Sequence, residues 1–506
     1  MTLARARVLE VAGDGLARAI PALAEEANAS ASVVRGLIEA GALDAASLPE
    51  FAPLPQPDPE FQTPALNPEQ QHAAVALVGA VSAHKFSAHL LDGVTGSGKT
   101  ETYFEAIAEA LRRKRQVLVL LPEIALTIQF LDRFAARFGV RPAEWHSDLS
   151  QKERKRVFRA VMTGEARVVV GARSSLFLPF ADLGLIVVDE EHEQAFKQEE
   201  GVIYHARDMA VVRAHTEDCP IVLSSATPSL ETFVNATTGR YGHLTLHQRH
   251  ANAALPDTKL IDLRSARGEP GTWISEPLRE AVAATLERGE QAMLFLNRRG
   301  YAPLTLCGAC GHKMVCRDCS AWLVEHRYRK KLMCHHCGFA TQTPPACPTC
   351  GTPSSFIACG PGVERVAEEF ALAFPQARMA IASSDTMHGP AETQLAIRAM
   401  INREIDVLIG TQIMAKGHHF PDLTLVGVID ADLGSADGDM RARERTFQLL
   451  HQVAGRAGRA QKPGLVLLQT RNPEDIVMKA LAAGDRDAFF KQEIAWRERA
   501  AAPPYG

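Results

Sequence analysis

The sequence contains no long uninterrupted apolar run. No stretch approaches the roughly 18 consecutive apolar residues that a membrane-spanning helix needs. The first residues include Arg5 and Arg7 but no apolar segment of the kind found in a secretory signal. The sequence therefore predicts no membrane partner and a location in the cytoplasm.

Charge of one sign and isolated cysteines are also scarce. The net charge of −4 excludes a chain that is polybasic throughout, but it allows a local basic surface for nucleic acid. Of the 10 cysteines, Cys219 and Cys359 alone lie outside Cys-x-x-Cys pairs. Pairs of this kind without a secretory signal favour bound metal over a disulfide scaffold. The chain also has no D…ExK-type acidic cluster, which argues against an ATP-driven nuclease.

The 506 residues are too many for one hydrophobic core, and three or four domains are expected. Apolar residues at helical spacing in 30–44 fit a small helix-turn-helix or winged-helix domain, or equally a helical bundle without a DNA role. Six prolines in 52–68 then indicate an extended linker. The predicted domains are a winged-helix-like domain at 1–51, a linker at 52–65, a first lobe at 66–235, a second lobe at 236–472 containing a cysteine-rich insertion at 305–352, and the start of a C-terminal domain at 473–506.

Short apolar runs alternate with amphipathic helices after the linker, which predicts an α/β fold with parallel sheets covered on both faces. The runs form two series, so two lobes are expected, with the cysteine block inserted after the first strand of the second series. The first series comprises 88–96, 116–122, 166–172, 183–191 and 220–228; the second comprises 291–297, 355–362, 405–412, 423–432 and 464–470.

The segment GVTGSGKT at 93–100 matches the phosphate-binding pattern G-x-x-x-x-G-K-[ST] between a predicted strand and a predicted helix. Its glycines let backbone N–H groups close around a phosphate at the helix N-terminus. Lys99 would reach the β- and γ-phosphates, and Thr100 would offer a hydroxyl to Mg²⁺. The predicted ATP-binding residues of this loop are Gly93, Gly96, Gly98, Lys99 and Thr100.

The segment LIVVDEEH at 185–192 places two carboxylates at the end of a buried strand. Asp189 is predicted to hold the Mg²⁺ shell, and Glu190 to orient and deprotonate the attacking water. A solvated acidic turn is the alternative, and it is the weaker one beside a phosphate loop.

The segment QVAGRAGR at 452–459 lies in the second lobe. Gln452 is predicted to contact the nucleotide, and Arg456 and Arg459 would share one face of a helix. Either arginine could stabilise charge on the γ-phosphate from across the cleft between lobes. The alternative is an ordinary basic helix face. A second lobe with such residues favours a motor over a kinase or a GTPase.

The order of these motifs resembles that of superfamily 2 helicases and, more narrowly, of the PriA replication-restart helicases, from about residue 10 to the end of the chain. The resemblance implies two RecA-like lobes and a nucleotide-contacting glutamine segment containing Gln70 and Gln71, of which Gln71 is the predicted ligand. It also implies single-stranded DNA contacts at 122–127, 171–175 and 410–417, and a DNA-sensing loop at 196–208. In that loop Phe196 and Tyr204 could stack on bases, and Lys197 and Arg207 could meet phosphates.

The paired cysteines form four knuckles, enough for two Cys₄ zinc sites, with iron–sulfur ligation as the runner-up. A redox role would need a thioredoxin-like context that is absent. The spacing allows three pairings of the knuckles, and the resemblance implies the nested one. In that pairing one ion is held by Cys307, Cys310, Cys347 and Cys350, and the other by Cys316, Cys319, Cys334 and Cys337.

The predicted function is that of a bacterial, cytoplasmic, monomeric ATP-dependent 3′-to-5′ DNA helicase that uses Mg²⁺ and two Zn²⁺ ions. The resemblance implies that it remodels stalled or abandoned forks, binds forked and single-stranded DNA, and initiates primosome assembly with primosome proteins and single-stranded-DNA-binding protein. The alternative is a zinc-dependent scaffold that does not unwind DNA. Against the family pattern, the chain is expected to be shortened at both ends, and His419 replaces the usual Asp or Asn.

Overall fold

The computed structural model describes two compact units, Met1–Leu54 and Pro55–Gly506. The described residues are 2–14, 18, 20–44, 53–122, 128–249, 255–265, 272–296, 304–307, 312, 314–318, 323–326, 331–334, 337, 339–353, 356–359, 363–382, 390–411, 420–432, 440–458 and 462–505. Within these ranges no helix combines the length and the hydropathy that crossing a bilayer would require.

The first unit is a small helical domain built from α1 (Leu3–Ala12), α2 (Ile20–Glu26) and α3 (Ala31–Glu39). Val8, Leu23, Val34 and Leu37 form its core, one or two from each helix. The part of this unit that the structure describes holds no strand that could serve as a wing. The winged-helix and helical-bundle interpretations therefore both remain predictions.

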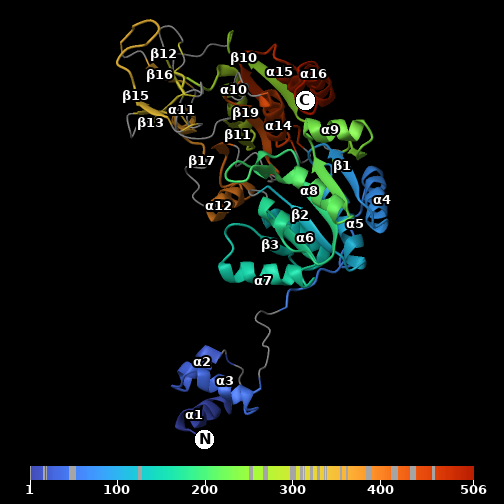
Figure 1. The fold of residues 1–506 in the computed structure, drawn as a ribbon. Helices are drawn as coiled ribbons and strands as arrows, with labels where there is room; N and C mark the ends of the chain where they lie inside the picture. The colour runs from blue at the N-terminus through green and yellow to red at the C-terminus, as the bar shows by residue number, and fades with distance from the viewer. Residues whose placement is uncertain are drawn as a thin grey trace. The chain divides into compact units, whose positions relative to one another are not determined.

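A parallel sheet of seven strands forms the first lobe, in the order β3-β4-β2-β5-β8-β1-β9. Figure 1 labels β1, β2 and β3 of this sheet. Its central strands are buried on both faces, which is why the sequence shows continuous apolar runs rather than alternation. The strands are β1 (Ser87–Gly93), β2 (Gln116–Leu120), β3 (Ala143–Trp145), β4 (Val168–Gly171), β5 (Leu183–Asp189), β8 (Pro220–Ser225) and β9 (Gly242–Leu246).

Two separate hydrophobic clusters cover the two faces of this sheet. One contains side chains of α4 (Pro68–Ser82), α5 (Lys99–Arg112) and α6 (Ile128–Phe138), and the other those of α8 (Ala206–Thr216). The lobe also carries α7 (Gln151–Met162) and α9 (Leu230–Thr237). Because β9 pairs in register with β1, the first lobe continues to Leu246, beyond the boundary predicted at 235.

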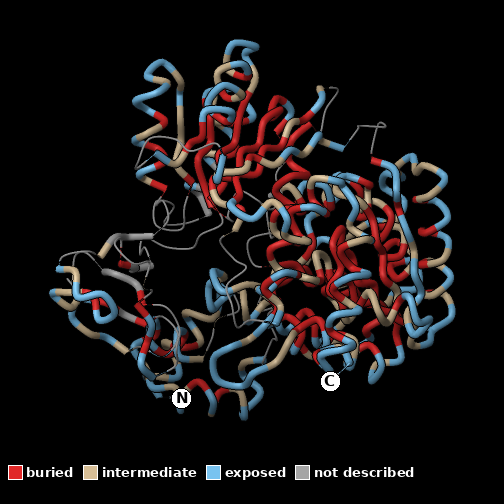
Figure 2. Tube along the Cα trace, turned by 90° about the horizontal axis from the view of Figure 1, so that it is seen from above, coloured by how far each residue is buried: buried red, intermediate tan, exposed pale blue. Residues whose placement is uncertain are grey.

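The second lobe has a six-stranded parallel sheet in the order β10-β20-β19-β11-β18-β17. Figure 2 colours the chain by burial and shows buried stretches surrounded by intermediate and exposed ones. The strands are β10 (Asp257–Asp262), β11 (Gln291–Phe295), β17 (Met379–Ala382), β18 (Val407–Gly410), β19 (Leu423–Val428) and β20 (Leu465–Thr470), and the helices are α10 (Glu276–Glu287), α11 (Val363–Ala373), α12 (Pro390–Ile401), α14 (Ala442–Ala454), α15 (Ile476–Ala483) and α16 (Arg486–Arg499).

The last two helices belong to the core of the second lobe. Phe489 and Phe490 of α16 are fully buried, and the Phe489 ring stacks on Phe447 of α14 with 4.4 Å between centroids. Val477 and Leu481 of α15 lie in the same cluster. The described residues of 473–505 therefore complete this lobe, and the predicted boundary at 472 does not separate two cores.

The cysteine block folds into its own antiparallel sheet, in the order β15-β14-β13-β12-β16. Its strands are β12 (Leu304–Cys307), β13 (Val324–His326), β14 (Lys331–Met333), β15 (Ala340–Gln342) and β16 (Phe356–Cys359). The prediction that 355–362 adds a strand to the second lobe is wrong, since β16 pairs with β12. The insertion therefore extends to Cys359, past the predicted end at 352, and its two ends lie side by side.

Replacing Phe490 by alanine should destabilise the second lobe strongly, because it empties a fully buried aromatic site. We expect a loss of about 3–5 kcal/mol in the free energy of unfolding, measured by denaturant titration. Leu372→Ala is the control, since Leu372 is 86% exposed. Equal midpoints for the two variants would contradict the placement of α16 in this core.

Candidate functional site

The phosphate loop connects the end of β1 to the start of α5, at the carboxyl edge of the first sheet. Gly96 and Gly98 have φ values of +85° and +80°, a region that favours glycine. A Cβ atom at Gly98 would lie 2.2 Å from the side-chain nitrogen of Gln70, and one at Gly93 would lie 2.5 Å from the Ser97 hydroxyl. Sterics thus account for all three glycines, and the loop can approach a phosphate closely.

Lys99 begins α5 and is largely buried in the loop. Its Nζ atom donates a hydrogen bond to the carbonyl oxygen of Gly93 over 2.8 Å. This contact holds the ammonium group above the loop, where phosphate oxygens would also meet it. Thr100 lines the same pocket and can offer its hydroxyl to a cation.

Gln70, rather than Gln71, contacts the phosphate loop. Its Nε2 atom donates to the carbonyl oxygen of Ser97 over 2.8 Å. Its Oε1 and backbone N–H are both hydrogen-bonded to Asn67 in a capping box at the start of α4. Gln71 is exposed. Gln70 is therefore the glutamine that supports the phosphate loop, while nucleotide contact by Gln71 stays a prediction. The Asn-x-x-Gln capping pattern was the sequence signal that distinguishes the two residues.

Asp189 ends β5 and faces the phosphate loop across the pocket. Tyr103 donates its hydroxyl hydrogen to Oδ2 over 3.1 Å, and the backbone N–H of Glu190 donates to Oδ1 over 3.1 Å. Burial raises the pKa of Asp189, and the neighbouring Glu190 charge raises it further. A cation at this carboxylate would offset both effects, as expected at a Mg²⁺ position.

Glu190 lines the pocket with a φ of +49°, which is uncommon for a residue with a Cβ atom. Such strain persists where surrounding structure holds it, and it concentrates at functional sites. The conformation turns the chain sharply after Asp189, so that consecutive residues can both border the pocket. This arrangement suits Glu190 for the predicted role of orienting a water molecule.

The second half of the DEEH segment links the pocket to residues 224–229. Glu191 is fully buried and accepts hydrogen bonds from the backbone and hydroxyl of Ser229, over 2.6 and 3.1 Å. Arg207 reaches the same carboxylate over 3.3 Å. His192 meets the Ser225 hydroxyl at 2.8 Å. These contacts connect the pocket to residues 224–229. The sequence motif did not indicate that Glu191 would be the centre of this network, because its partners lie far away along the chain.

The second lobe completes the pocket with Gln452 and Arg456. Helix α14 ends at Ala454, and Arg456 lies in the following turn rather than on a helical face. Burial lowers the pKa of Arg456 to about 10, and Glu190 partly opposes this change. The guanidinium remains charged at neutral pH. Arg459 lies outside the described residues.

Several side chains that the motifs did not single out also border the pocket, among them Arg133 and His451. Arg133 of α6 lies on its wall and is ion-paired with Glu101. His451 precedes Gln452, and burial lowers the pKa of its imidazole to about 4, so the ring is neutral at neutral pH. Both residues are polar positions on amphipathic helices. The sequence pattern of such a helix does not distinguish a side chain that borders a pocket from one that faces solvent.

The predicted DNA-sensing loop is only partly available to DNA. Phe196 is 1% exposed in the core of the first lobe, and Arg207 is held by Glu191, so the predicted base stacking and phosphate contact are wrong for these two. Tyr204 packs edge-on against Phe177, with 5.3 Å between centroids. Lys197 is exposed. Of the other predicted DNA segments, 123–127 and 412–417 lie outside the described residues, as does His419.

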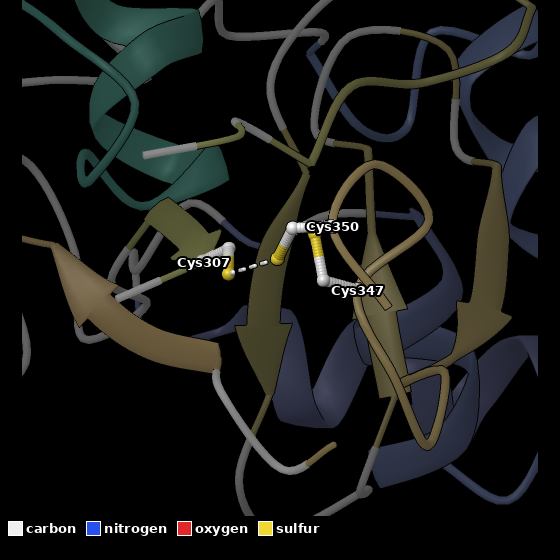
Figure 3. Close-up of side chains that lie close together, drawn as sticks. All are labelled: Cys307, Cys347 and Cys350. Carbon is white, nitrogen blue, oxygen red and sulfur yellow. Dashed lines mark hydrogen bonds between the residues drawn. The ribbon is translucent and has the colours of Figure 1, made fainter. Parts of the chain in front are cut away.

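Six of the described cysteines form two clusters of three. In the first, the sulfur atoms of Cys307, Cys347 and Cys350 lie within 4.8 Å of one another, with 3.6 Å between Cys307 and Cys350 (Figure 3). The second contains Cys316, Cys334 and Cys337 in the same manner, with 3.5 Å between Cys316 and Cys337. These groups are the ones that the nested pairing requires. Cys310 and Cys319 lie outside the described residues.

The donor set of each cluster fits zinc. Backbone N–H groups of Asp318 and Thr349 point at the sulfur atoms of Cys316 and Cys347, each over 3.4 Å. Three thiolates around one point, with a fourth cysteine in each knuckle pair, match a closed structural Cys₄ zinc site. The clusters lie in the insertion, with Cys307 on β12 and Cys334 directly after β14, so they would brace this sheet rather than take part in phosphate chemistry.

Gln70→Ala should weaken ATP binding, because it removes both the support of the Ser97 carbonyl and half of the capping box. We expect a several-fold rise in the KM for ATP, since a lost hydrogen bond is worth about 1 kcal/mol. Gln71→Ala is the matched control and should leave KM unchanged. The reverse ranking in steady-state ATPase kinetics would restore Gln71 as the contact.

Cys350→Ser should remove one zinc ion and leave the other. Metal analysis of the purified variant is expected to give about half the zinc of the unchanged protein, because each knuckle pair serves one ion. Cys219→Ala, in the core of the first lobe, should keep the full zinc content. Loss of all zinc from Cys350→Ser would show that the two clusters do not bind independently.

Comparison with known families agrees with this division of the chain. Residues 67–235 match the DEAD/DEAH box helicase family, residues 361–461 the helicase conserved C-terminal domain, and residues 316–341 the PriA DNA helicase Cys-rich region domain. The last match covers Cys316, Cys334 and Cys337, the whole of the second cluster.

Curated relatives match most of the chain. The replication restart protein PriA of Rickettsia prowazekii is 48% identical over 445 residues, which are 88% of this chain and 68% of the relative. The protein of the same name from Bacillus subtilis is 39% identical over 492 residues, covering 96% of this chain and 61% of the relative. The structure of RecG bound to a three-way DNA junction covers 94% of this chain and 49% of RecG, with a TM-score of 0.50 and 16% identity, a likeness of fold.

Proposed function

The chain belongs to the PriA family of replication restart proteins and is an ATP-dependent DNA helicase, and we propose that it moves 3′ to 5′ on stalled or abandoned forks and initiates primosome assembly there. The observation that carries the motor assignment is the composite pocket. Lys99 and Asp189 come from the first lobe and Arg456 from the second, so the site is complete only with both lobes in place.

In the proposed reaction each side chain acts on a different part of ATP. Lys99 and the backbone of the phosphate loop bind the β- and γ-phosphates, and Thr100 and Asp189 would hold Mg²⁺, which would neutralise charge on the phosphates. Glu190 orients the attacking water and accepts its proton. Arg456 stabilises the charge that develops on the γ-phosphate oxygens. Arg459 and Gln452 belong to the same motif and are proposed to assist.

The coupling of hydrolysis to DNA is proposed to pass through residues 224–229. Ser225 contacts His192 next to the catalytic carboxylates, and Gln448 of α14 donates to the carbonyl oxygen of Thr227 over 3.3 Å. This segment thus touches both the ATP pocket and the second lobe. A change in the spacing of the lobes on DNA would therefore reach Glu190 through a short path.

Forked and single-stranded DNA are the proposed substrates, acted on by a monomer in the bacterial cytoplasm. Primosome proteins and single-stranded-DNA-binding protein are the proposed partners, with the zinc insertion as one contact region. A scaffold with an idle motor is disfavoured, because the residues for nucleotide binding and for hydrolysis are brought together in one pocket.

Lys99→Ala should abolish DNA-stimulated ATP hydrolysis while fork binding persists. Removal of a buried charge that contacts transition-state oxygens costs on the order of 10²–10³-fold in kcat. ATP turnover and fluorescence anisotropy with a labelled fork measure the two effects, and Lys85→Ala, an exposed lysine of the same lobe, is the control.

The direction of movement is tested on forks with a single-stranded tail of one polarity. Strand separation that requires a 3′-tailed template strand supports the proposal. Strand separation that requires a 5′ tail, or no DNA stimulation of the unchanged protein, would overturn it.

A further inference from the structure

An ion pair joins α16 to the strand that leads into the phosphate loop. Arg486 donates from Nη1 to Oδ1 of Asp92 over 2.5 Å and from Nη2 to Oδ2 over 2.9 Å. Asp92 is 3% exposed and lies near the end of β1, whereas Arg486 is the first residue of α16. The pair therefore connects residues 394 positions apart, on different lobes, in the two-bond geometry that arginine and carboxylate favour.

Arg486 also contacts residues 224–229, the coupling segment through which hydrolysis is proposed to be linked to DNA. Its Nη1 atom donates to the carbonyl oxygen of Ala226 over 3.0 Å, and Ala226 lines the ATP pocket. On the other side, His243 of β9 lies 3.3 Å from Oδ2 of Asp92. One guanidinium thus meets the phosphate-loop strand and residues 224–229 together, while its own helix is anchored in the second core by Phe489 and Phe490.

The position of Asp92 gives this contact a direct connection to the phosphate loop. Gly93 follows Asp92, and its carbonyl oxygen accepts the hydrogen bond from Lys99. A shift of the Asp92 side chain therefore moves the peptide that holds the catalytic ammonium group. At the same time, α14 and α16 pack together through Phe447 and Phe489. Gln452 lies on α14, and Arg456 lies in the turn that follows this helix.

We propose that Arg486 is a positioning residue for ATP hydrolysis: it holds the second lobe against Asp92 and Ala226, so that Arg456 enters the pocket while Lys99 is held in place. This role of Arg486 rests on the proposed ATP-dependent motor activity. It assigns a part in ATP hydrolysis to a residue that lies outside the helicase motifs. Other contacts join the two lobes nearby, such as the hydrogen bond that the backbone N–H of Leu230 donates to Glu444 over 2.9 Å. This contact lies at the start of α9, directly after residues 224–229, and does not reach the strand before the phosphate loop.

The environment of the pair makes it sensitive to substitution. Burial opposes the charge on Asp92, but hydrogen bonds from His243 and the charge of Arg486 outweigh it and lower the pKa of the carboxyl group. Without Arg486, the buried carboxylate of Asp92 would keep the imidazole of His243 as its one side-chain partner among the residues that the structure describes. Loss of one partner of such a pair is far more damaging than loss of an exposed pair.

The test is a kinetic comparison of Arg486→Ala, Arg486→Lys, Asp92→Asn and the double variant Asp92→Asn/Arg486→Ala. For Arg486→Ala we expect kcat of DNA-stimulated hydrolysis to fall about tenfold, in the range usual for coupling between sites, with little change in the KM for ATP. Lysine should restore part of kcat, because it keeps the charge and loses the two-bond geometry. The double variant should be no slower than Arg486→Ala, since both changes break one interaction.

Arg378→Ala is the matched control. Arg378 makes a similar two-bond contact with Asp406, over 2.6 and 3.0 Å, but inside the second lobe, and its loss should leave kcat unchanged. All variants are compared well below their melting temperatures, so that a folding defect is seen separately.

The two proposals fail in different ways. If the unchanged protein shows DNA-stimulated hydrolysis and Arg486→Lys and Arg486→Ala lower kcat no more than Arg378→Ala, the role of Arg486 is overturned and the motor remains. If kcat falls in step with lost folded fraction, Arg486 is merely structural and the proposal is also overturned. Absence of DNA-stimulated hydrolysis in the unchanged protein would overturn both.

Discussion

The burial of Arg456 opposite the phosphate loop is the constraint on which the rest of the ATP site depends. A guanidinium taken out of water is costly, and here the cost lowers its pKa to about 10. The second lobe must therefore offset this cost through other contacts, and those contacts are the polar links from α14 and α16 to residues 224–230 and to Asp92. When γ-phosphate charge develops in the pocket, the same burial strengthens its attraction to Arg456.

The phosphate loop and the acidic pair could be predicted from the sequence because each is a short local pattern. The phosphate loop is recognised from three glycines and Lys99 that lie within a few residues of one another, between a strand and a helix. Asp189 is placed at the edge of the sheet by the buried strand that precedes it. Parallel strands place their carboxyl ends at one edge, so two such patterns must meet. The two-lobe fold followed from the same continuous apolar runs.

The errors and omissions share a different cause, which is long-range packing. Phe196 looks like an exposed aromatic in a polar loop, but the core formed with α8 buries it, and Arg207 is captured by a glutamate 16 residues away. The strand at 356–359 has the apolar sequence pattern of a lobe strand, but it pairs with β12 at the start of the insertion. Arg486 lies 394 residues from Asp92 and in no motif, so no local pattern could have indicated it.

The zinc insertion and the motor are separated by this same arrangement of strands. Because β12 and β16 pair with each other, the insertion closes its own sheet and leaves the second lobe through two adjacent ends. The nested cysteine clusters reinforce that closure: Cys307 on β12 joins Cys347 and Cys350, which precede β16. Metal loss should therefore loosen the insertion sheet, while β11, β18 and β19 of the second lobe keep their pairing. The zinc clusters thus lie in the insertion sheet and its turns, and the ATP pocket lies between the two lobes, so loss of zinc is expected to leave the pocket in place.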